Sequence, residues 1–139
     1  MIKVHLDTSY LMPLFGLETS IDNLREGLLK ILQKKQCVFN YSSVSIIEIK
    51  WMIFKLIKKG QEEKSLEKRF TQALSTLQMD SRYNLVHFVS PELNEVSYAL
   101  RRLGHRDYFD TIIAGSALLA ADMLITEDDP LKKVIQRYF

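Results

Sequence analysis

Four carboxylates fall at places in the sequence where side chains from separate elements can meet. Asp7 and Asp128 each lie just past the end of a short apolar run that is typical of a β-strand. Glu48 and Asp110 lie near the start of two helical segments, those over 44–59 and 108–121. In a parallel α/β sheet, the carboxyl ends of the strands and the amino ends of the covering helices share one edge, where ligands bind. We therefore expect the four carboxylates to converge.

Carboxylates that converge need a partner. Neighbouring negative charges raise one another's pKa, and burial adds to this effect. A divalent cation reverses the cost, because Mg²⁺ prefers oxygen ligands. Two such ions about 3.5–4 Å apart can activate water and stabilise the leaving oxygen in phosphodiester cleavage. With a single cysteine, Cys37, and no His-Glu-x-x-His pattern, the sequence disfavours zinc.

Each acid also has a purely structural interpretation, which for Asp7, between a strand and a helix, is that of a helix cap. Ser45-x-x-Glu48 matches a capping box, in which the glutamate bonds back to the start of its own helix. Asp128 or Asp129 suits the cap of a short final helix. Asp110, near a helix start, is favourable to the helix dipole. The sequence leaves both interpretations open for each residue.

The elements that position these acids alternate between strands and helices. Apolar β-rich runs predict strands over 2–6, 37–41, 85–89 and 123–126. Helical spacing and start signals predict helices over 8–15, 21–32, 44–59, 66–77, 91–103 and 108–121, and a short one at the end. Helical connections between successive strands imply crossovers and a parallel sheet covered on both faces. The fold class is α/β.

Length and composition are those of one soluble domain. The chain has 139 residues, of which 47% are hydrophobic, so we expect a single domain over 1–139. The longest uncharged stretch, 111–121, is far shorter than the roughly 20 residues of a membrane helix. The first residues are too polar for a signal peptide. We expect no membrane association and a cytoplasmic protein.

Four segments resemble the motifs of the PIN-domain family, and within it the VapC-type toxin ribonucleases. They are Val4–Leu11 with its Asp-Thr-Ser turn, Ser43–Ile49 around Glu48, Asp110–Ala117, and Leu124–Asp128. They occur in the family's order and span almost the whole chain. The resemblance implies a three-layer α/β/α domain with a parallel sheet. The sheet would have four strands, or five if Ile135–Phe139 forms the strand that usually follows the last helix.

The resemblance also implies a function. It is that of an endoribonuclease that depends on Mg²⁺ or Mn²⁺, with the catalytic metal ligands Asp7, Glu48, Asp110 and Asp128. Ser9 and Thr126 would orient these ligands or water. Toxins of this kind commonly form homodimers and are inhibited by an antitoxin protein, whereas other members act in RNA processing.

Two further acids lie beside the matched positions. Asp107 precedes Asp110 by three residues, and Asp129 follows Asp128. Either could support the predicted metal site as a neighbour of its ligands. For Asp107 the structural alternative is a helix N-cap, a position that aspartate favours.

An RNA substrate requires basic side chains near the acids, because phosphate contacts supply most non-specific affinity. The total charge of +2 is uninformative, but neutralising the four predicted ligands leaves nineteen basic residues against thirteen acidic ones. The candidate RNA contacts are Lys50, Arg101, Arg102 and Arg106. His105, in the same segment, is expected to be a surface or capping residue.

The segment 44–59 is apolar on more than one side, which predicts burial on several sides. One interpretation places it between the sheet and the helix over 66–77. The other gives part of its surface to a homodimer or to an antitoxin.

Two other functions fit parts of the pattern. A catalytically silent PIN-like scaffold would bind RNA or protein without cleavage, but it would not need all four acids. A receiver-like phosphate-binding domain is also acidic at its strand ends, but it gives no place to Glu48 and Asp110.

Overall fold

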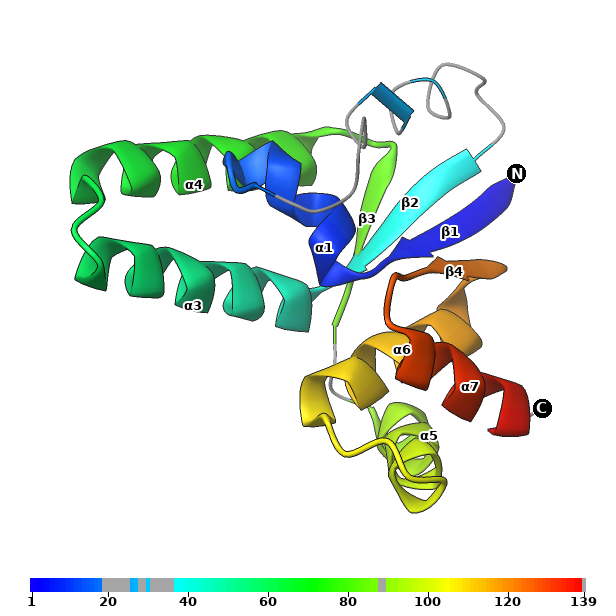
Figure 1. Cartoon of the computed structure of the whole chain (residues 1–139). Helices are drawn as coiled ribbons and strands as arrows, with labels where there is room; N and C mark the ends of the chain where they lie inside the picture. Colours follow the sequence, from blue (N-terminus) through cyan, green and yellow to red (C-terminus); the bar gives the residue numbers. More distant parts are fainter. Residues whose placement is uncertain (19–25, 28–29, 31–36, 88–89, 139) are drawn as a thin grey trace.

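The computed structural model describes residues 1–18, 26–27, 30, 37–87 and 90–138 (Figure 1). The helix predicted over 21–32 lies outside the described residues, apart from isolated positions. The other predicted helices and all four strands are present, with ends that differ by a few residues. The third strand begins at Tyr83 rather than at Leu85, and the helix predicted over 66–77 begins at Glu63.

Four parallel strands form the centre of the molecule. They are β1 (Ile2–Leu6), β2 (Cys37–Ser42), β3 (Tyr83–Val86) and β4 (Met123–Ile125), in the order β3-β2-β1-β4. Leu6 pairs with Tyr41 on one side and with Ile125 on the other. The chain segments that follow these three strands therefore leave the sheet side by side, as the sequence predicts.

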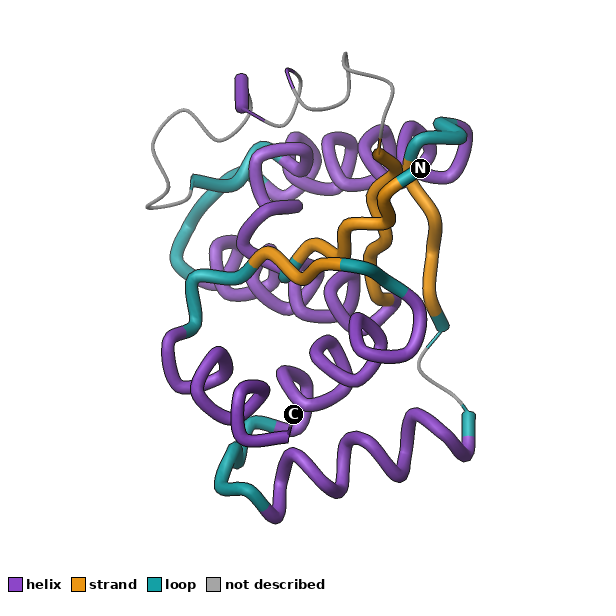
Figure 2. Tube along the Cα trace, turned by 90° about the vertical axis from the view of Figure 1, so that its right-hand side faces the viewer, coloured by secondary structure: helices purple, strands orange, loops and turns teal. Residues whose placement is uncertain are grey.

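Helices cover both faces of the sheet (Figure 1 and Figure 2). One layer contains α1 (Thr8–Leu11), the 3-10 helix η1 (Met12–Phe15), α3 (Ser43–Lys58) and α4 (Glu63–Met79). The other layer contains α5 (Pro91–Arg102), α6 (Tyr108–Ala120) and α7 (Asp129–Tyr138). The predicted α/β/α layering with a parallel sheet is confirmed.

Each layer has its own apolar core. Leu6, Phe39 and Ile53 are fully buried between the sheet and the first layer. Leu100 and Leu131 are fully buried in the second. The sheet is thus held on both faces, which fixes the edge from which the acids project.

Of the two alternatives, four strands or five, the described residues form four. The segment from Ile135 continues as helix α7 through Tyr138. The reason is the spacing of apolar residues: Leu131 and Val134, three positions apart, are both buried against α5 and α6.

Helix α3 is less enclosed than its composition predicts. Ile49 and Ile53 are fully buried, but 49% of Ile47, 62% of Trp51 and 49% of Phe54 are exposed. These three residues recur at helical spacing and form one apolar stripe, which we call the α3 stripe. Packing between the sheet and α4 therefore does not account for the whole helix.

None of the helices in the described ranges has the length and apolarity to cross a membrane.

Candidate active site at the carboxyl edge of the sheet

Asp7 lies at the end of β1 and is held on both carboxylate oxygens. Its Oδ1 accepts a hydrogen bond from the Thr8 backbone at 2.7 Å, and its Oδ2 accepts one from Thr126 Oγ1 at 2.6 Å. Burial raises the pKa of Asp7, the two hydrogen bonds oppose this, and the negative charges of Asp128 and Asp107 add to the rise. The carboxylate is therefore rigid, mostly buried and destabilised in its charged form.

Glu48 points to the same edge from the second turn of α3. Its Oε1 accepts a hydrogen bond from Thr8 Oγ1 at 2.7 Å, and Thr8 Oγ1 also lies 2.9 Å from Ser45 Oγ. Burial raises the pKa of Glu48, and the charges of Asp7 and Asp107 add to this. Contact with Thr8 ties this acid to the residue that follows Asp7.

The capping-box interpretation of Glu48 is wrong. The N-cap of α3 is Ser42, whose Oγ accepts a hydrogen bond from Val44 N at 3.1 Å. Ser45 is thus three positions inside the helix, and Glu48 is too far along to bond back to its start. This leaves its carboxylate available to the cluster.

Asp110 pairs with a buried histidine. His105 follows Gly104, which ends α5 with a φ of 111°, and only 7% of His105 is exposed. Its Nε2 lies 3.0 Å from Asp110 Oδ2. The expectation that His105 is a surface or capping residue is wrong, because the turn at Gly104 folds it inward against α6.

The pKa of Asp110 is the most strongly raised in the cluster, to about 7. Burial is the main cause; His105 opposes it, and Asp128, Asp107 and Asp7 raise the value further. The charged form of Asp110 is therefore unfavourable in the chain alone.

Asp128 caps α7 and also lies in the carboxylate cluster. Its Oδ1 accepts a hydrogen bond from Leu131 N at 3.0 Å, so it caps α7, while its own N–H donates to Thr126 Oγ1 at 3.1 Å. The ligand atoms of Asp128, Asp110 and His105 also lie within 4.8 Å of one another. Capping orients this carboxylate and does not remove it from the cluster.

The neighbouring predicted residues divide into two groups. Asp107 is the N-cap of α6 and accepts a hydrogen bond from Asp110 N at 3.1 Å, which confirms the structural interpretation. Its charge still acts on the cluster, since it raises the pKa of Asp110. Asp129 instead is exposed and faces Lys132 at 3.6 Å. Ser9 is half-buried in α1, but the hydroxyl that contacts Glu48 belongs to Thr8.

The predicted RNA contacts also separate. Lys50 lies 2.6 Å from Glu67 Oε2 and 4.5 Å from the Phe70 ring centroid, so it joins α3 to α4. Arg101 and Arg106 line an open pocket of about 360 Å³ beside His105, whereas Arg102 does not line it. Two of the four candidates thus line the pocket that His105, the partner of Asp110, also lines.

Sequence reasoning missed four contributors to the site: Thr8, Ser45, His105 and the Tyr10–Glu127 pair. The Tyr10 hydroxyl donates to Glu127, and burial together with this carboxylate raises the pKa of Tyr10 to about 12. The adjacency of Thr8 to Asp7 was a usable signal. The contacts of Ser45 and of the Tyr10–Glu127 pair join distant segments and have no local signature, and the burial of His105 depends on the turn at Gly104.

The cluster has the donor set of a site for a hard divalent cation. It offers carboxylate oxygens and one imidazole nitrogen, with no thiolate. No Lys or Arg in the described ranges forms an ion pair with Asp7, Glu48, Asp110 or Asp128. Mg²⁺ or Mn²⁺ would fit this arrangement and relieve its repulsion.

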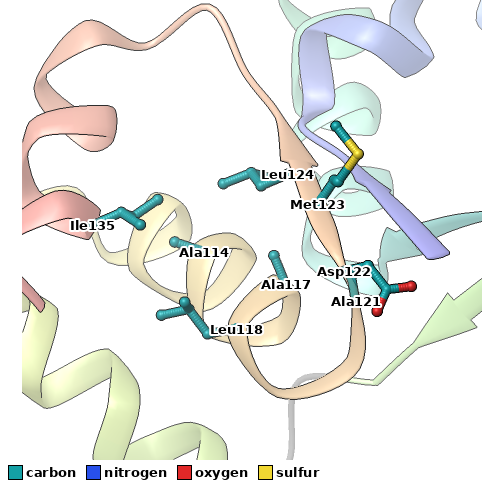
Figure 3. Close-up of a pocket in the computed structure, with 8 residues that line it drawn as sticks. All are labelled: Ala114, Ala117, Leu118, Ala121, Asp122, Met123, Leu124 and Ile135. Carbon is teal, nitrogen blue, oxygen red and sulfur yellow. The ribbon is translucent and has the colours of Figure 1, made fainter. Parts of the chain in front are cut away.

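A second cavity, of about 180 Å³, lies between α6, β4 and α7 (Figure 3). Its lining is mostly apolar, including Leu118, Leu124 and Ile135. Asp122, its only acid, accepts a hydrogen bond from Lys3 N at 2.8 Å. This cavity lacks groups for catalysis, so the carboxyl edge is the better candidate.

Comparison with solved structures identifies the fold of this chain. A chain of the VapBC2 complex from Rickettsia felis, bound to a DNA fragment from its promoter, matches with a TM-score of 0.67 and 17% identity, over 96% of this chain and 93% of that one. This chain has the PIN-domain fold of VapC-type proteins. The family resemblance of the sequence is thereby confirmed for the fold.

Two further solved structures are similar to this chain. A chain of a toxin–antitoxin complex from Klebsiella pneumoniae has a TM-score of 0.57 and 25% identity, over 90% of this chain and 86% of that one. VapC20 of Mycobacterium tuberculosis, a toxin that cleaves the sarcin–ricin loop, has a TM-score of 0.59 and 13% identity, over 94% and 93%. No family model matches this sequence, and a search of curated proteins gives no significant match.

Proposed function

We propose that this chain is a PIN-type endoribonuclease that depends on Mg²⁺ or Mn²⁺. The observation that carries the proposal is the meeting of Asp7, Glu48, Asp110 and Asp128 at one edge of the sheet, each within electrostatic reach of another. A protein gains nothing in stability from partly buried carboxylates that raise one another's pKa. Such an arrangement is retained for a ligand that neutralises it.

These four carboxylates would hold the cation. Thr126 orients Asp7 and Asp128 together, because its hydroxyl contacts both residues. Thr8 does the same for Glu48. A divalent cation bound there supplies Lewis acidity, which makes water a better nucleophile and stabilises the leaving oxygen of a phosphodiester. The preset hydrogen bonds keep the ligands in place, so little reorganisation accompanies binding.

RNA is the proposed substrate. The similar toxin from M. tuberculosis cleaves RNA in the sarcin–ricin loop. In this chain Arg101 and Arg106 supply positive charge at the pocket that His105 also lines, and His105 contacts Asp110. This charge would attract the phosphate backbone to an edge that is otherwise acidic.

We further propose that the chain is the toxin of a toxin–antitoxin pair. Similar structures come from such complexes. The exposed α3 stripe of Ile47, Trp51 and Phe54 offers an apolar face to a partner segment. Replacing Trp51 with Lys should leave RNA cleavage unchanged and weaken binding of the protein encoded beside this gene. If instead the isolated chain is a dimer in light scattering and Trp51→Lys makes it monomeric, the stripe is a homodimer surface.

Cleavage of a mixed RNA pool tests the proposed activity. We expect cutting by the wild-type chain with Mn²⁺ or Mg²⁺, none with EDTA, and none by Asp7→Asn or Asp110→Asn. Asp129→Asn is the matched control, because it removes an exposed acid outside the cluster. Equal cutting by all variants would overturn the site, and RNA binding without any cutting would favour a silent scaffold. A nuclease that has no antitoxin gene beside it would belong to RNA processing.

A further inference from the structure

The open pocket beside the acids is bounded by α5, by the loop after it and by the start of α6. Its lining includes Tyr98, Arg101, His105, Arg106, Tyr108 and Thr111. Its volume of about 360 Å³ is within the range of small-ligand sites. The pocket is thus large enough to receive part of a nucleotide.

The walls of the pocket present groups that are free to bind a ligand. Of Tyr98, 56% is exposed, and of Tyr108, 61%. Across the described residues, no acidic side chain forms an ion pair with Arg101 or Arg106. Two guanidinium groups and two exposed phenol rings therefore border one hollow.

The hydroxyl groups at the floor of the pocket already have hydrogen-bond partners within the protein. Ser97 Oγ lies 2.7 Å from Thr111 Oγ1, and the Thr111 hydroxyl donates to Tyr108 O at 2.7 Å. These bonds join α5 to α6 and hold the start of α6 in place. The floor is rigid, and the charged and aromatic walls carry the binding capacity.

One residue joins this pocket to the carboxylate cluster. His105 lines the pocket, and its Nε2 lies 3.0 Å from Asp110 Oδ2. Only the His105 side chain therefore separates a ligand in the pocket from Asp110. That separation fits the nucleotide next to a phosphate that lies on the cluster.

We propose that this pocket binds one nucleotide of single-stranded RNA adjacent to the scissile phosphate. The base lies against the Tyr98 and Tyr108 rings, and its phosphate contacts Arg101 and Arg106. Bidentate guanidinium contacts suit phosphate oxygens, and aromatic rings accept any base by stacking. The proposal rests on the nuclease function above and adds where the substrate chain runs.

Adjacent arginines provide a matched test of the phosphate contact. Arg101 and Arg102 are both exposed in the last turn of α5, but only Arg101 lines the pocket. Binding of a fluorescein-labelled 12-nucleotide RNA of mixed sequence is measured by anisotropy with EDTA, at several salt concentrations. Arg101→Gln should lower the slope of log affinity against log salt by about 0.7, the share of one single-strand phosphate contact. Arg102→Gln should leave the slope unchanged.

The aromatic contact is tested separately. Tyr108→Leu should weaken RNA binding about fivefold or more, the loss expected for one stacked base. Trp51→Leu, which removes an exposed ring from α3, should have no such effect. An RNA that carries 5-iodouridine should crosslink to Tyr98 or Tyr108 on irradiation, as read by mass spectrometry of the peptides.

The outcomes separate this proposal from the nuclease function. Metal-dependent RNA cleavage with equal effects of Arg101→Gln and Arg102→Gln, or with crosslinks only outside the pocket, would overturn the pocket alone. Absence of both RNA binding and cleavage in the wild type would overturn both. A larger effect of Arg101→Gln together with a crosslink in the pocket supports the proposal.

Discussion

Neutralising Asp110 should stabilise the metal-free chain at alkaline pH. The pKa of its carboxyl is raised from 3.8 to about 7 in the folded chain. At pH 8 the full ionisation of Asp110 therefore opposes folding by on the order of 4 kcal/mol, since one pKa unit corresponds to about 1.4 kcal/mol. Asp110→Asn removes the cost of burying this charge beside other acids but weakens the bond to His105. We expect a net gain of about 2 kcal/mol, or roughly 6–8 °C in melting temperature for a domain of this size.

The gain should depend on pH with a definite sign. Because the pKa of Asp110 is higher in the folded than in the unfolded chain, the folded state keeps this proton between about pH 4 and 7. The contribution of Asp110 to wild-type stability falls as pH rises through this window and is constant above it. Near pH 4 the wild-type carboxyl is protonated in the folded chain, so the gain from Asp110→Asn should be gone and the weakened bond to His105 should leave the variant no more stable than the wild type. Titrating groups outside the cluster act equally on both proteins and cancel in the difference, whereas the groups that interact with Asp110 are part of the measured gain.

The assay is urea unfolding followed by circular dichroism, in EDTA, at pH 4, 6 and 8. Asp129→Asn is the control, because it removes an exposed acid whose carboxylate faces Lys132. Its stability should match that of the wild type at each pH. A loss of more than about 1 kcal/mol in Asp110→Asn at pH 8 would refute the reasoning, since it would make Asp110 a structural partner of His105 rather than a repelled member of the cluster.

Three other substitutions test particular contacts. Thr126→Val should destabilise the chain by about 1.5–3 kcal/mol in urea unfolding, because it removes the hydroxyl that donates to the Asp7 carboxylate, whereas Thr126→Ser should retain stability. His5→Leu should stabilise the chain by about 2 kcal/mol more at pH 5 than at pH 8. Burial lowers the pKa of His5 to about 4, so below about pH 6.5 the folded state resists the protonation that the unfolded state accepts. An equal gain at both pH values would contradict this. Lys50→Gln should leave RNA affinity unchanged and cost less than about 1 kcal/mol, since Lys50 pairs with Glu67; a clear loss of RNA binding would restore Lys50 as a substrate contact.

The strands and the edge that they define could be predicted from sequence because their signals are local. Apolar runs mark the strands, and the crossover rule makes them parallel. Asp7 and Asp128 then lie just after strand ends, whatever the details of side-chain packing. For these residues, position along the chain was enough to predict position in space.

The contacts of other side chains could not be predicted, because they depend on tertiary packing and on where turns and helices begin. His105 is buried only because the chain turns at Gly104 and folds back on α6. Ser42 and Ser45 are equally good N-caps by residue type, and the end of β2 decides between them. Lys50 is on the same helix as Glu48, but the Lys50 ammonium forms an ion pair with Glu67 on α4.

The rate of RNA cleavage as a function of Mn²⁺ concentration tests the central claim most directly. The substrate is one labelled single-stranded RNA, and the proteins are the wild type, Glu48→Gln, Asp110→Asn and Asp129→Asn. The account predicts saturable, metal-dependent cleavage by the wild type and Asp129→Asn, and a rate at least about 100-fold lower in the other two, as expected when a group that stabilises developing charge is lost. Cleavage by Glu48→Gln and Asp110→Asn at the wild-type rate, with folding intact, would contradict it.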